Sequence, residues 1–186
     1  MALSCLAGCA EPPRKEMDQA QGAIDAARAV GAAEYAATEL DAAVTALARA
    51  DEAVGQRDYR LALSQALEAR ERAQVAARDA ASRQAELRSQ AEREAAALET
   101  AAQAASTRLD DLRRRKVTPV LLAAATSALA GAEQALQEAR TRLAAQEFRL
   151  AVEALQGPAA QLSAAMSDLE QAVATRPSPP PARRPR

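Results

Sequence analysis

The chain has 186 residues, a mass of 19.5 kDa and a formal net charge of −1, with 24 basic and 25 acidic side chains. Alanine supplies 54 residues, only three residues are aromatic and histidine is absent, a composition that favours long, thinly packed helices and excludes a thick layered α/β core. Both cysteines lie among the first nine residues, so the rest of the chain has no thiol, imidazole or soft metal ligand, and we expect no enzyme activity, no cofactor and no metal site.

The N-terminus is an apolar run of small residues that leads to Cys9. Its last four residues, Leu6-Ala7-Gly8-Cys9, resemble the bacterial lipobox. The resemblance implies that residues 1–8 belong to a signal peptide and that Cys9 is lipidated and becomes the mature N-terminus. It also implies sorting to the outer membrane by default, because Ala10 follows Cys9 where Asp would retain such a protein in the inner membrane. A signal peptide has a basic start and about 7 to 15 apolar residues. We therefore interpret Met1 as an internal start and expect more signal sequence upstream.

The first predicted elements follow a tether at residues 9–15. Apolar residues at steps of three and four predict a helix that ends near Gly31; they are Met17, Ala20, Ile24 and Ala27. A second helix should end at Gly55, because large apolar residues recur every seven positions with Ala between them. From Asp58 to about Leu112 there is neither Gly nor Pro, which predicts a continuous helix of ~55 residues.

The second half of the chain begins with another turn. Arg113 to Lys116 place cations where a helix C-terminus favours them, and Thr118-Pro119 is typical of a helix start. The next helix carries a leucine every seven residues: Leu122, Leu129, Leu136 and Leu143. A final helix should be broken or kinked at Gly157-Pro158.

The two halves repeat each other at a separation of 89 residues. Leu40, Ala43, Leu47 and Ala50 fall on Leu129, Ala132, Leu136 and Ala139. Likewise Tyr59 falls on Phe148 within two similar hexapeptides, residues 58–63 and 147–152. Ala144 replaces Gly55 in the second copy, which leaves open whether the chain turns between Ala144 and Glu147 or continues as helix.

These patterns predict an all-α fold of elongated antiparallel helical hairpins. We expect two three-helix bundles that share the long central helix and have coiled-coil-like seams of Ala and Leu. A single long hairpin with the second half folded alongside is the alternative. The expected domains are residues 16–112 and 113–175, followed by a disordered tail at 176–186 that is rich in Pro and Arg.

Part of this pattern resembles a known family. Ala32 to Ala43, Ala50 to Val54 and Gln56 to Ala62 are similar to an uncharacterised Ala-rich helical-hairpin domain of Gram-negative envelope lipoproteins. The resemblance covers about residues 14–112 and implies a helical hairpin without known active residues. Ala37 stands where the family has a proline, and Gln56-Arg57 separates Gly55 from Asp58.

Charged and aromatic residues supply the candidate sites. Asp110-Asp111 and Asp51-Glu52 are neighbours on a helix and point about 100° apart, so neither forms a facing carboxylate pair. Four acid-before-base pairs at i,i+4 should stabilise solvated helix faces: Glu68–Arg72, Asp79–Arg83, Asp110–Arg114 and Asp111–Arg115. The aromatic residues are interpreted as plugs between helices or, if exposed, as partner anchors: Tyr35, Tyr59 and Phe148.

The sequence therefore favours a non-catalytic protein, lipid-anchored through Cys9, that acts in the periplasm as a spacer or a scaffold for an unknown envelope protein. The alternative is a cytosolic coiled-coil adaptor that forms homo-oligomers through the same seams. A weaker hypothesis is binding of nucleic acid or an anionic surface through Arg113 to Lys116 and Arg183 to Arg186. Without the four arginines of residues 176–186 the chain has 20 basic and 25 acidic residues, which disfavours nucleic acid.

Overall fold

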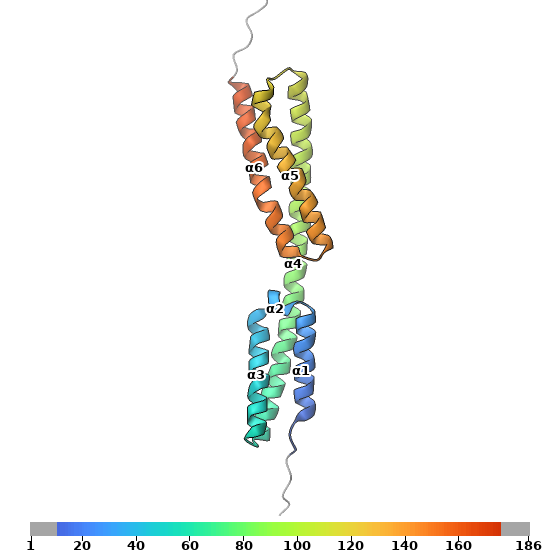
Figure 1. Ribbon diagram of the computed structural model, residues 1–186, viewed down its shortest axis with the longest axis vertical. Coiled ribbons are helices and arrows are strands. Elements are labelled where there is room, and N and C mark those ends of the chain that lie inside the picture. Colours follow the sequence, from blue (N-terminus) through green and yellow to red (C-terminus); the bar gives the residue numbers. More distant parts are fainter. Residues whose placement is uncertain (1–10, 176–186) are drawn as a thin grey trace, which may run out of the picture. The chain divides into compact units, whose positions relative to one another are not determined.

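The computed structural model describes residues 11–175, which form helices and, within that range, no strand (Figure 1). The helices are α1 (Arg14–Ala29), α2 (Ala32–Tyr35), α3 (Ala37–Gly55), α4 (Tyr59–Arg114), α5 (Pro119–Ala144) and α6 (Phe148–Ala174). The all-α prediction and the long central helix are confirmed. The short helix α2 was not predicted.

The chain divides into two compact units between Ala85 and Glu86. The first unit contains α1, α2, α3 and the beginning of α4, and the second contains the rest of α4 with α5 and α6. This division lies inside α4, whereas the sequence placed a boundary at residue 112, next to the α4–α5 turn. Each unit is therefore a three-helix arrangement to which α4 contributes one part.

Alanine forms the seam of the first unit. One face of α4 presents six alanines without solvent exposure: Ala62, Ala66, Ala69, Ala73, Ala76 and Ala80. Three of them, from Ala73 to Ala80, pack in one cluster with Ile24 and Ala27 of α1 and with Leu40 of α3. Small side chains let helix backbones approach closely, so this unit gains contact between helices with little apolar volume.

Leucine forms most of the core of the second unit. Leu98, Leu109 and Leu112 of α4 pack with leucines of α5 and α6 in the largest cluster. The repeat makes the contrast direct, because residues 89 positions apart are alanine in one unit and leucine in the other: Ala66 and Leu155, Ala73 and Leu162, Ala80 and Leu169. Each buried leucine contributes about 1.5–3 kcal/mol relative to exposure, so the second unit has the larger hydrophobic stabilisation.

The second half of α4 repeats α1, although at a different separation. Three buried residues of α1 recur 85 positions later as buried residues of α4: Ala20 as Ala105, Ile24 as Leu109 and Ala27 as Leu112. The separation changes because the connections differ. Residues 30–36 with α2 link α1 to α3, whereas residues 115–118 link α4 to a longer α5. Each unit therefore repeats the same three helices.

Three helix ends share one type of turn, in which a residue other than glycine is left-handed. Arg57, Lys116 and Gln146 have φ of 59°, 60° and 62°. The N–H of Asp58 donates to the carbonyl oxygen of Ala53 at 2.9 Å, and the N–H of Glu147 donates to that of Arg142 at 2.9 Å. These are Schellman caps, and those at Arg57 and Gln146 are 89 residues apart. The chain thus turns at residues 145–147, and Gly55 is the last residue of α3 rather than the turning residue.

Pro158 does not break the final helix. Of the break or kink that the sequence predicted at Gly157-Pro158, the break is absent, because α6 runs through Pro158 as one helix. The missing N–H removes one hydrogen bond inside the helix. Leu155 and Leu162 on either side are buried against the other helices, and this packing holds the element together.

Candidate functional site

The three predicted partner anchors do not form one site. Tyr35 is half-buried and packs against the first unit's cluster of α1, α3 and α4 residues. Tyr59, also half-buried, begins α4 at the opposite end of α3. Phe148 is 8% exposed at the start of α6 in the second unit. Phe148 therefore fills space between helices, while the two tyrosines keep part of their surface open.

The predicted ion pairs form in part. Arg72 pairs with Glu68 at 3.0 Å, as predicted, and also reaches Glu39 of α3 at 3.3 Å. The hydrogen bond and the charge of Glu68, followed by those of Glu39, raise the pKa of the Arg72 guanidinium. Between residues 11 and 175 no ion pair joins Asp79 to Arg83. Among the residues of the four predicted pairs, Arg72 is the one whose ion pairs also join two helices, α4 and α3.

The basic run at the end of α4 is partly neutralised. Arg113 pairs with Asp110 at 2.8 Å, in place of the predicted Arg114, and Arg115 pairs with Asp111 at 2.9 Å. Two of the four cations therefore have a carboxylate beside them, which lowers the local positive potential that phosphate would need. Arg183 to Arg186, the other predicted cluster, lies outside the described residues.

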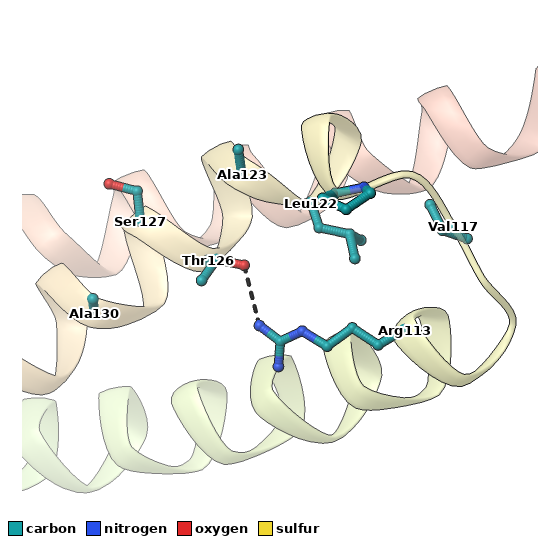
Figure 2. Close-up of a pocket in the computed structure, with 8 residues that line it drawn as sticks. Arg113, Val117, Leu122, Ala123, Thr126, Ser127 and Ala130 are labelled. Atoms are coloured by element: carbon teal, nitrogen blue, oxygen red, sulfur yellow. Dashed lines mark hydrogen bonds between the residues drawn. The ribbon is translucent and has the colours of Figure 1, made fainter.

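A groove of about 680 Å³ lies beside this run, between the end of α4 and the start of α5 (Figure 2). Its wall is mainly apolar, with Val117, Leu122 and Ala123 among the residues that line it. Arg113 crosses the groove, and its Nη2 donates to Oγ1 of Thr126 at 3.4 Å. The groove can accept an apolar group but presents one polar edge and no nucleophile beside a base.

A second groove, of about 360 Å³, lies at the α3–α4 end of the first unit. Arg49, Glu52 and Gln56 of this end line it together with Leu61 and Gln65. Oε1 of Gln65 is buried without a hydrogen-bond partner, although its Nε2 donates to Glu68 at 3.3 Å. A single orphaned amide oxygen beside mixed charges defines no particular ligand.

Surface leucines at the start of α4 were missed by the sequence analysis. Leu61, Leu63 and Leu67 are 45%, 38% and 40% exposed. The sequence predicted only a continuous helix here and gave these leucines no role. Their signal in the sequence is the spacing of four between Leu63 and Leu67, which puts both on one flank of the helix.

Residues 15–108 match a protein family described as a domain of unknown function, DUF4398. The chain belongs to the DUF4398 family. The DUF4398 match begins in α1 and ends within α4, so it covers the first unit from residue 15 onward and part of the first helix of the second. No curated protein and no solved structure matches the chain.

The DUF4398 match confirms that this part of the chain is a domain of an uncharacterised family, over nearly the range that the resemblance covered. Helices α5 and α6 lie outside the match, although they repeat α3 and the beginning of α4. No group of His, Cys, Asp and Glu within the described residues could hold a metal ion. None of the helices described is both long and apolar enough to cross a bilayer. Cys9, the predicted lipidation site, lies outside the residues that the structure describes.

Proposed function

We propose that this DUF4398 protein is a non-catalytic lipoprotein, anchored through Cys9 to the periplasmic face of the outer membrane, where its helical units act as a spacer or an interaction scaffold. The observation that carries the proposal is the segment Leu6-Ala7-Gly8-Cys9, followed by Pro12-Pro13 and then by the first helix at Arg14. A lipidated cysteine, a short tether and a folded body is the order that an anchored periplasmic protein requires.

The folded units support a scaffold through their surfaces. Their outer faces carry arginines paired with carboxylates along and between helices, such as Arg72 with Glu39 and Arg140 with Glu99. Because the two units repeat each other, they expose similar residues at equivalent positions. Leu61 and Leu150, which are 89 residues apart, are 45% and 39% exposed. Paired surfaces of this kind suit binding to other proteins rather than chemistry on a small substrate.

The two cysteines provide a matched test. Cells that express the chain with its native upstream sequence are labelled with a palmitate analogue, and Cys9→Ala is compared with Cys5→Ala. We expect the wild type and Cys5→Ala to carry label and to sediment with outer membranes, and Cys9→Ala to lose both. An unlabelled wild-type protein in the soluble fraction would contradict the proposal and favour the cytosolic adaptor.

A further inference from the structure

The first unit leaves uncovered a core position that the second unit covers. Val152 of α6 is 5% exposed and packs with Ala151 and with Ala91 of α4. Its counterpart 89 residues earlier, Leu63, is a larger apolar residue and is 38% exposed. An equivalent position is thus buried in one copy and open in the other.

The start of α1 differs from the corresponding part of α4, because α1 begins at Arg14. At the separation of 85 residues, Arg14 corresponds to Glu99, and α4 extends beyond Glu99 toward its N-terminus to include Ala91. Residues 11–13 are not helical, because Pro12 and Pro13 disfavour helix in the residues before them. At the same separation Ala91 corresponds to Leu6, which lies outside the described residues and, under the proposed function, is removed with the signal peptide.

A second exposed leucine extends the same surface. Leu67 lies four residues after Leu63 on the same flank of α4 and is 40% exposed. Its counterpart in the second unit is Gln156, a polar residue that is exposed. The first unit therefore has two apolar side chains where the second has one buried valine and one solvated amide.

Contacts at both ends of α1 show that this surface lies beside the entry of the chain into the fold. Nη1 of Arg70 donates to Oε1 of Gln19 at 2.8 Å, and Nε2 of Gln84 donates to the carbonyl oxygen of Val30 at 2.8 Å. Helices α1 and α4 therefore run parallel, so Leu63, seven residues before Arg70, is close to the level of Pro13. Figure 1 shows the start of α1 and the α3–α4 turn at the same end of the unit.

The distance from the proposed anchor limits what can cover this surface. Pro13 is four positions after Cys9, so the two are at most ~14 Å apart when the chain is fully extended. If Cys9 is in the membrane interface, Leu63 is within reach of the same interface. Nearby charges are close to balance, since Arg14 and Lys15 are followed by Glu16 and Asp18.

We infer that Leu63 and Leu67 form a membrane seat, a surface by which the first unit rests on the phospholipid bilayer next to its anchor. The inference rests on the proposed lipidation of Cys9 and adds to it a contact between the folded unit and lipid. Burial of the two leucine side chains in the membrane interface holds the first unit against the bilayer. Because the local charges nearly cancel, this contact should persist in high salt.

The test imposes the anchor chemically, so it does not depend on lipidation in the cell. The chain has no tryptophan and two cysteines, and Cys5→Ser leaves one thiol at Cys9 for coupling to a maleimide lipid in vesicles of phosphatidylethanolamine and phosphatidylglycerol. Leu63→Trp places a reporter on the seat. Val30→Trp is the matched control, because Val30 is 42% exposed and lies at the other end of α1.

When the protein is tethered, we expect the tryptophan fluorescence of Leu63→Trp to shift to shorter wavelength. Its quenching by iodide should decrease several-fold, and both changes should be the same in low and high salt. Val30→Trp should stay unchanged, and adding Leu67→Glu should return the Leu63→Trp reporter to the behaviour of a solvated residue. Circular dichroism verifies that each variant is folded.

Two results would overturn the membrane seat. One is a tethered Leu63→Trp that remains as accessible to iodide as Val30→Trp. The other is a Leu63→Trp that is already shielded without vesicles, which would mean that the chain itself or a second copy covers the position. If the protein is not lipidated in the cell, the palmitate label will be absent, but the fluorescence of the chemically tethered protein will not change.

Discussion

At the scale of single residues, the turns show where local conformation is unfavourable. Arg57, Lys116 and Gln146 all adopt positive φ, which costs an L-residue about 1–2 kcal/mol. Each turn still forms because two backbone hydrogen bonds close its helix and because the following helix is packed. These hydrogen bonds and this packing therefore maintain the left-handed conformation without glycine.

Replacement of one of these residues by glycine should stabilise the protein. We expect Gln146→Gly to raise the free energy of unfolding of the second unit by about 0.5–1 kcal/mol, because glycine adopts this φ without steric cost. Gln134→Gly is the control: Gln134 is exposed within α5, and the change should destabilise by about 1 kcal/mol. Urea unfolding measures both, and equal destabilisation would disprove the left-handed turn.

Among the glycines of residues 11–175, Gly31 is the one that both adopts positive φ and has another side chain close to its Cα. Its φ is +80°, and a Cβ there would come within 2.8 Å of Nε2 of Gln84, the donor that caps the carbonyl of Val30. We expect Gly31→Ala to destabilise the first unit by about 1–2 kcal/mol. Gly22→Ala, inside α1 with open space around it, should stabilise by up to about 1 kcal/mol. Thermal unfolding that ranks the two variants in the reverse order would contradict this account.

At the scale of elements, the two seams differ in how closely helices pack. Ala73 and Leu162 occupy equivalent positions and are 0% and 2% exposed. We therefore expect the alanine seam to resist a larger side chain at this position, and the leucine core to lose packing when the side chain is shortened. Pro158 also shows that the second unit depends on packing. Proline lacks an N–H and disfavours a helix interior, yet the buried leucines on either side of Pro158 maintain α6.

Exchanging the residue types at this position tests the difference. Ala73→Leu should destabilise the first unit by about 1–3 kcal/mol through overpacking, and Leu162→Ala should destabilise the second by about 2–5 kcal/mol through a cavity. Chemical denaturation followed by circular dichroism measures both changes. If Ala73→Leu were neutral or stabilising, the close packing of the alanine seam would be wrong.

At the scale of the whole molecule, much of the fold could be predicted from the sequence. Three sequence patterns predict where helices form and which of their faces pack together. They are the heptads of Leu and Ala, the absence of Gly and Pro after Asp58, and the repeat at 89 residues. The match of α1 to the second half of α4 was not predicted, because connections of different length change the separation to 85. Leu63 was missed because the exposure of its side chain depends on how the helices pack, which periodicity does not encode.

The candidate site was less predictable than the fold. Phe148 and the tyrosines were identified by residue type, but whether an aromatic side chain is buried depends on tertiary packing that periodicity does not encode. The proposed anchor is the reverse case, since it rests on the resemblance of Leu6 to Cys9 to a lipobox, which is a pattern in the sequence and does not depend on tertiary packing.

The central claim is that a lipid on Cys9 holds two helical units at a membrane. Intact-mass and peptide mass spectrometry of the native protein, extracted from membranes with detergent, tests it most directly. The account predicts an N-terminal peptide that starts at Cys9 and carries the mass of acyl chains. A native protein that retains residues 1–8 and has a free thiol at Cys9 would contradict it.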